Sequence, residues 1–170
     1  MTIKEEPPAV TENVFRETFD VFYARERRQI VGLAYVLSGS RAGAEDLAQE
    51  AFLAALRNWN KIGVYDDPGA WVRRVVANRS VSALRRSAAE ARALIRLGSP
   101  GSSVPELSAD SVDAWDAVRR LPKRQAQAVA LHYFDGQQVA DISRILECSE
   151  NTVKTHLKRA MATLRQEMER

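Results

Sequence analysis

The chain has 170 residues, of which 45% are hydrophobic and 28% charged, a composition typical of folded protein rather than of disordered or fibrous sequence. No stretch approaches the roughly 18 consecutive apolar residues of a membrane span, and the acidic, proline-bearing start is unlike a signal peptide, so we expect a cytoplasmic protein without membrane insertion. One cysteine and two histidines fall short of a zinc-binding set, so we expect no metal and no cofactor.

The net charge of +3 is unevenly distributed along the chain. Residues 1–70 carry a balance of −3, whereas residues 71–97 hold seven arginines against one glutamate, a balance of +6. An arginine-rich block beside an acidic block predicts two kinds of partner, an anionic polymer for the first and a basic surface for the second.

Hydrophobic periodicity predicts three helices in the first half of the chain, after an N-terminal tail of residues 1–12. The first helix is expected over residues 13–38 and the second over residues 42–59. The third begins at Asp67 and Pro68, where aspartate can cap the helix and proline fits its first turn, and runs toward Arg96. Residues 97–110 collect glycine, proline and serine with little periodicity and are predicted to be a flexible linker.

Four shorter helices are expected after the linker, over residues 112–120, 124–134, 138–146 and 150–168, and no segment has the pattern of a strand. The predicted fold class is therefore all-α, with two small helical domains over residues 13–96 and 111–170.

The last two of these helices have the pattern of a helix-turn-helix, with Ser149 placed to cap the second. Val153, Leu157, Ala160 and Leu164 fall on one side of that second helix, whereas its other side is polar and cationic. Amide, hydroxyl and ammonium groups near a helix N-terminus suit the major groove of duplex DNA. The alternative is an ordinary solvated helix face.

A second nucleic-acid surface is predicted on the third helix, where polar, aromatic and cationic residues share a stripe about 80° wide between apolar flanks. Its members are Trp71, Arg74, Asn78, Ser82 and Arg85. Aromatic faces for stacking, arginines for phosphates and an amide for base edges are what unstacked single-stranded nucleic acid requires. The alternative places the nearby tryptophans in the core; we favour the core for Trp59, which continues a buried face, and binding for Trp71.

The stretch AEDLAQEAFLAAL in the second helix has an acidic face. Leu47, Ala51, Phe52 and Ala55 are expected to turn inward, and the outer face then consists of Asp46, Gln49, Glu50, Leu53 and Arg57. An exposed leucine among acids suits a protein groove, whereas DNA phosphates would repel the carboxylates. This face is therefore predicted to bind a protein.

Taken in order, these blocks resemble the extracytoplasmic-function (ECF) class of bacterial sigma factors. AEDLAQEAFLAALRNW is similar to the core-binding helix of that family, whose D-L-x-Q-E-x-F signature is matched by Asp46, Leu47, Gln49, Glu50 and Phe52. PGAWVRRVVANRSVSALRR resembles its −10 helix, and residues 121–165 resemble its −35 domain. The resemblance implies that residues 13–96 are sigma region 2 and that residues 111–170 are sigma region 4.

The resemblance also implies partners and sites. The partners are core RNA polymerase, through its β′ clamp helices, promoter DNA, and in many cases an anti-sigma factor; no catalytic centre is implied. Core polymerase would contact Asp46, Gln49, Glu50, Leu53 and Arg57. The −10 element would contact Lys61, Tyr65, Trp71, Arg74, Asn78, Ser82 and Arg85. The −35 element would contact Arg124, Asn151, Thr152, Lys154, Thr155, Lys158 and Arg159.

Two positions depart from the family pattern. Glu147 stands in the helix-turn-helix turn where the family often has glycine. Either a glutamate at positive φ is strained there, at a cost on the order of 1 kcal/mol, or the turn does not require a left-handed residue. The pair Gln137 and Gln138 replaces the usual apolar and hydroxyl pair, so the sequence does not predict a side-chain cap there.

Two other functions compete with this one. A LuxR-type helix-turn-helix regulator would explain residues 111–170 and leave the acidic and arginine-rich helices without a role. A nuclease or recombinase would need clustered carboxylates or a positioned nucleophile, and the only acidic pair near the arginines, Asp66 and Asp67, is explained by helix capping.

Overall fold

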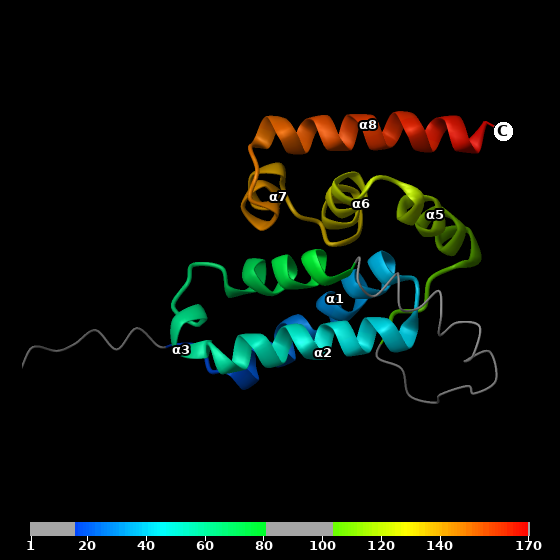
Figure 1. Cartoon of the computed structure of the whole chain (residues 1–170). Helices are drawn as coiled ribbons and strands as arrows, with labels where there is room; N and C mark the ends of the chain where they lie inside the picture. Colours follow the sequence, from blue (N-terminus) through cyan, green and yellow to red (C-terminus); the bar gives the residue numbers. More distant parts are fainter. Residues whose placement is uncertain (1–15, 81–103, 170) are drawn as a thin grey trace, which may run out of the picture.

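A computed structural model describes residues 16–80 and 104–169, and every structural statement below concerns those residues (Figure 1). All regular secondary structure in these two ranges is helical. The predicted all-α fold class is confirmed. None of the helices within these ranges is both long and apolar enough to cross a membrane.

The first module begins with two helices. Helix α1 spans Phe19–Ser38 and α2 spans Arg41–Arg57. The predicted start of the first helix was too early, because Thr18 is extended and its hydroxyl accepts a hydrogen bond from the Val21 N–H. Gly39 ends α1 in the left-handed conformation at φ 73°. Each helix therefore has its own local start or stop signal.

A short helix, α3 (Trp59–Ile62), follows α2, and sequence periodicity did not separate it from α2. The next helix begins at residue 68 and is described to residue 80; we call this segment the arginine helix. The Asp67 carboxylate accepts from the Ala70 N–H at 3.0 Å, so the predicted cap is confirmed. The predicted continuation over residues 81–96 lies outside the described residues.

The second module contains α5 (Ala109–Arg120), α6 (Lys123–Val129), a π-helical turn η1 (Ala130–Phe134), α7 (Val139–Leu146) and α8 (Glu150–Met168). The helix expected over residues 124–134 is thus regular only to Val129. Its last turn is wider, and the Asp135 N–H donates to the Ala130 carbonyl five residues back. This turn directs Phe134 and Asp135 toward the first module.

The turn between α7 and α8 is strained at one residue. Glu147 lies in the left-handed region at φ 54°, ψ 48°, as a glycine at this position would. Ser149 caps α8 by accepting from the Thr152 N–H at 3.1 Å, as predicted. The side chain of Gln138 makes no capping hydrogen bond to α7, in agreement with the sequence.

The two modules pack against each other over one continuous apolar core. Phe22 and Leu33 of the first module and Leu131, Ile142 and Val153 of the second belong to the same buried cluster. In Figure 1, α6 and α7 lie over the arginine helix. Helix α1 of the first module also contacts α5 and η1 of the second. Val104, in the middle of the predicted linker, is buried in this cluster as well.

Candidate nucleic-acid and protein interfaces

Helix α8 presents the polar face that the sequence predicts. Val153 and Ala160 are buried. The predicted DNA-contacting residues on this helix other than the half-buried Thr152 are exposed: Asn151, Lys154, Thr155, Lys158 and Arg159. The Thr155 hydroxyl donates to the Asn151 carbonyl at 2.9 Å, which leaves its oxygen free to accept from a base or a backbone group.

Arg124 of α6 extends this cationic face. It is exposed, and together with Arg159 it lies close enough to His156 to affect the imidazole. Partial burial, and then the positive charges of Arg124 and Arg159, lower the pKa of His156 below its ordinary value. Protonation of His156 is therefore disfavoured, and the positive charge of this edge comes chiefly from the arginines and lysines.

The predicted −10 residues are only partly brought together. Tyr65, Trp71 and Arg74 line an open cavity of about 580 Å³ with Asp66 and Asp67. Lys61 and Asn78 are exposed but do not line this cavity. Ser82 and Arg85 lie outside the described residues. Trp59 packs against Phe19 and Phe22, as favoured from the sequence.

Arg74 does not project freely into solvent, because its guanidinium is bound by the second module. It donates to the carbonyls of Ile145 at 3.2 Å and Arg144 at 2.8 Å, and it lies 3.0 Å from the Glu147 carboxylate. Arg144 also borders the cavity that Tyr65 and Trp71 line. In this arrangement α7 and the following turn cover part of the predicted −10 surface.

Arg73, to which the sequence analysis gave no role, forms a buried ion pair between the modules. Its guanidinium donates to Asp135 at 2.5 Å and to Glu26 at 2.9 Å. Only 9% of the Arg73 side chain and none of the Asp135 side chain is exposed. Burial alone would lower the pKa of Arg73, but the hydrogen bonds and charges of Asp135 and Glu26 raise it. A usable sequence signal existed, because Arg73 falls between Val76 and Ala77 on the apolar face of its helix.

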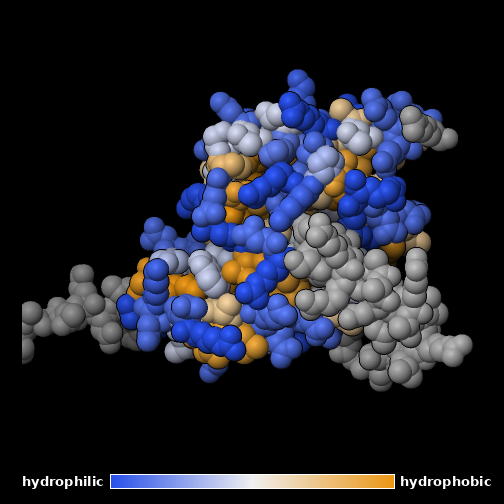
Figure 2. All heavy atoms as spheres, in the orientation of Figure 1, coloured by the Kyte–Doolittle hydropathy of each residue, from blue (hydrophilic) through white to orange (hydrophobic). Residues whose placement is uncertain are grey.

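The acidic helix has the predicted orientation. Leu47, Ala51, Phe52 and Ala55 are buried. All five predicted polymerase contacts are exposed: Asp46, Gln49, Glu50, Leu53 and Arg57. Leu53 is 42% exposed, and Leu56, which was not singled out, is 49% exposed. Figure 2 shows hydrophobic side chains among hydrophilic ones at the surface in the part of the molecule where α2 and α3 lie.

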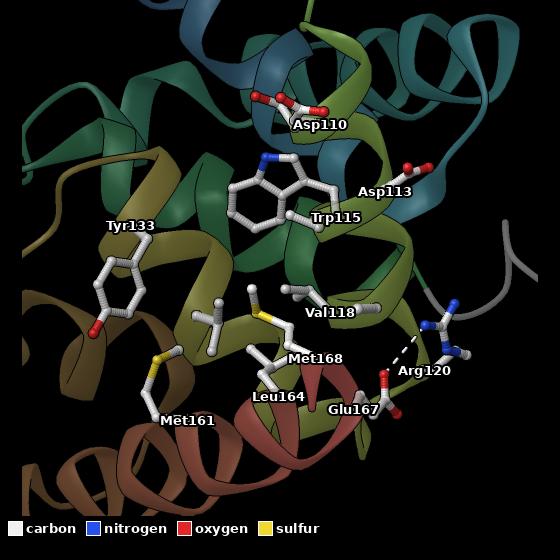
Figure 3. A pocket seen from close by; sticks show the side chains of 14 residues that line it. Asp110, Asp113, Trp115, Val118, Arg120, Tyr133, Met161, Leu164, Glu167 and Met168 are labelled. Carbon is white, nitrogen blue, oxygen red and sulfur yellow. Dashed lines mark hydrogen bonds and ion pairs between the residues drawn. The ribbon is translucent and has the colours of Figure 1, made fainter. Parts of the chain in front are cut away.

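A surface groove that the sequence analysis missed lies between α5, the end of α6 and α8 (Figure 3). It has a volume of about 590 Å³. Its apolar lining includes Trp115, Val118, Tyr133, Met161, Leu164 and Met168. Asp110, Asp113 and the exposed Arg120–Glu167 pair form a charged rim. The spacing of three between Val112, Trp115 and Val118 was the available signal for an apolar stripe on α5. No group of three or more potential metal ligands occurs within the two described ranges.

Comparison with known proteins decides the family. Two family models match the chain, Sigma-70 region 2 over residues 22–90 and Sigma-70, region 4 over residues 111–164. The ECF RNA polymerase sigma factor SigM of Mycobacterium tuberculosis is 31% identical over 149 residues, which cover 88% of this chain and 76% of SigM. The chain belongs to the ECF sigma factors. It directs promoter-specific transcription by RNA polymerase, and its relatives are regulatory DNA-binding proteins rather than enzymes.

Other similarities agree with this assignment. The ECF sigma factor BldN of Streptomyces coelicolor is 32% identical over 176 residues, covering 96% of this chain and 64% of BldN. The sigma factor RpoE of Bartonella quintana, solved with the anti-sigma factor NepR, has the same fold, with a TM-score of 0.69 at 21% identity over 89% of this chain and 96% of RpoE. Because the region 2 match covers the first module, the LuxR-type alternative, which explains the second module alone, is not favoured.

Proposed function

We propose that three surfaces of this sigma factor carry separate parts of initiation. The outer face of α2, with Asp46, Gln49, Glu50, Leu53 and Arg57, binds the β′ clamp helices of core polymerase. The arginine helix, with Lys61 and Tyr65 before it, recognises and opens the −10 element. Helix α8 with Arg124 holds the −35 element as duplex.

The observation that supports this division most directly is the pairing of charge with exposed apolar surface on α2. Leu53 and Leu56 are both more than two-fifths exposed, and Asp46 and Glu50 lie on the same exposed face of α2 as Leu53. Carboxylates next to exposed leucines favour a protein partner that offers basic and apolar groups. Helix α8 has the opposite character, since its exposed face is amide, hydroxyl and cationic.

For the −10 surface, support comes from Tyr65, Trp71 and Arg74, which line one open cavity. Two aromatic rings and a guanidinium around a cavity provide stacking surfaces and a phosphate contact for an unstacked base. On this proposal the chain has no catalytic centre, acts in the cytoplasm beside the polymerase, and is regulated by an anti-sigma factor of the kind seen with RpoE.

The experiment is run-off transcription with purified core polymerase on genomic fragments. We expect wild type to produce discrete transcripts. Reversing the charge at two exposed positions of α2, Asp46→Lys with Glu50→Lys, should abolish transcripts and co-purification with core polymerase. Binding of the variant to −35 duplex DNA in the absence of polymerase should persist.

The matched control is Glu106→Lys with Glu169→Lys, which makes the same change in net charge at exposed positions outside α2. The control should retain transcription. Retained co-purification in the α2 variant would contradict the assignment of that face, and equal loss in the control would show that net charge alone is responsible.

A further inference from the structure

Side chains of each module bind backbone carbonyls of the other. Gln127 of α6 is buried and donates to the Ala77 carbonyl of the arginine helix at 2.6 Å. Arg119 of α5 donates to the Val36 carbonyl of α1 at 2.9 Å. With the Arg74 hydrogen bonds described above, these contacts fix the second module over the arginine helix.

At the centre of this contact is the buried Arg73. Taking a guanidinium and a carboxylate out of water is costly unless all their polar groups are paired. Here Arg73 is bound from both sides, by Glu26 of α1 and by Asp135 of the second module, and Asp135 also accepts from Gln137 at 2.9 Å. Such a pair is satisfied in one relative placement of the modules and leaves buried charge unpaired in others, so it specifies that placement.

A second feature fits the same placement. Gly32 stands in the middle of α1, where glycine is the least favourable residue after proline. A Cβ at this position would lie 2.6 Å from Cζ of Phe134 and 2.8 Å from its Cε1. The absence of a side chain at Gly32 is therefore what allows the π-helical turn of the second module to approach α1.

We call the arrangement in which the second module packs on the arginine helix the closed form. It affects the proposed DNA-binding and polymerase-binding surfaces differently. It engages the Arg74 guanidinium and places Arg144 at the edge of the cavity that contains Trp71. The outer face of α2 stays open, since Leu53, Asp46 and Glu50 remain exposed. Closure thus covers surface assigned to DNA and leaves surface assigned to polymerase available.

We propose that this sigma factor inhibits itself by docking its second module over the −10 surface of its first, with the Arg73–Asp135 pair as the latch. This rests on the proposed function, because the covered surface is the one assigned to strand opening. Core polymerase can engage α2 in the closed form, whereas strand opening requires the modules to separate.

The test uses two variants that weaken docking by different means. Asp135→Asn removes the charge partner that the second module supplies to Arg73 and leaves Glu26 in place. Gly32→Gln inserts a side chain where Phe134 lies while keeping every charge. Neither residue belongs to a proposed binding surface. Glu167→Gln is the control, since it removes a carboxylate paired with Arg120 within the second module. Circular dichroism checks that helix content is kept, and the Gly32 variant provides the test if the Asp135 variant does not fold.

Two measurements are made on the full chain. Small-angle scattering should show a larger radius of gyration for both docking variants than for wild type and the control. Loss of one partner of a buried charge pair should shift the closed–open equilibrium by about thirtyfold or more. Fluorescence anisotropy with a mixed-sequence single-stranded DNA oligonucleotide should show binding at least about tenfold tighter for the docking variants, since Arg74 and the cavity become available.

Unchanged scattering in both folded variants would overturn the closed form. Expansion of the Gly32 variant without expansion of a folded Asp135 variant would overturn the latch. Expansion without tighter binding of single strands would overturn the masking. Run-off transcription separates this from the proposed function: if neither wild type nor variants direct transcription, the functional assignment fails, while the scattering result still decides whether the modules dock.

Discussion

Replacing Glu147 with glycine should stabilise the protein. Glu147 is in the left-handed region at φ 54°, ψ 48°, where the Cβ of an L-residue crowds the following carbonyl oxygen. The strain amounts to roughly 1–2 kcal/mol for a residue other than glycine. Glycine relieves it because it has no Cβ, but glycine also gains about 0.5–1 kcal/mol of conformational freedom in the unfolded chain.

The lost ion pair is a small correction. The Glu147 carboxylate lies 3.0 Å from Arg74 but is 67% exposed, so solvent screens most of this interaction. The expected net gain is therefore about 0.5–1 kcal/mol. For a protein of this size, 1 kcal/mol corresponds to a rise in Tm of roughly 2–4 °C.

Thermal unfolding by circular dichroism is a suitable assay, with Glu147→Ala as the matched control. Alanine removes the same charge but keeps the Cβ, so it should be neutral or slightly destabilising. A glycine variant no more stable than the alanine variant would refute the strain argument, since the two differ here only in the Cβ and in backbone freedom.

Three further predictions concern the proposed surfaces. Lys158→Ala should weaken −35 duplex binding and reduce the magnitude of its log–log salt slope by about one, and an unchanged slope in filter binding would mean that Lys158 does not contact phosphate. Asn78→Ala should reduce strand opening, measured by permanganate footprinting, more than closed-complex binding; equal loss of both would count against the −10 assignment. The His156 pKa measured by NMR should lie below its ordinary value and should rise in Arg159→Ala. Because protonation of His156 is disfavoured in the folded state, its contribution to stability is lost as the pH falls below about 6.5.

Features determined by local sequence could be predicted. The inward positions of α8, the Ser149 cap and the exposed Leu53 follow from helical periodicity and capping chemistry, both of which act over a few residues. The family resemblance identified Glu147 as the turn position but left open whether a left-handed residue is required there, and the structure shows that it is left-handed. The roles of the exposed residues stay predictions, since exposure shows availability and not contact.

Features that depend on distant residues could not be predicted. Arg73 and Asp135 are 62 positions apart, and no local pattern indicates that they meet. The π-helical turn that directs Asp135 toward Arg73 is a rare structure, and the apolar spacing of its residues predicts an ordinary helix. The groove between α5 and α8 likewise requires knowing how two helices separated by α6 and α7 are placed.

The chemistry of the contact between modules bears on whether it can open. An interface made only of large apolar side chains would expose them to water on separation, at roughly 25 cal/mol for each Å². Here the contact combines the shared apolar core, against which Phe134 packs, with Arg73, Asp135 and Gln127, which regain hydration when the modules part. The ion pair therefore contributes more to the choice of docked geometry than to the free energy of docking. A contact of that composition is suited to a domain arrangement that must be well defined when closed and still separate when the promoter strands are engaged.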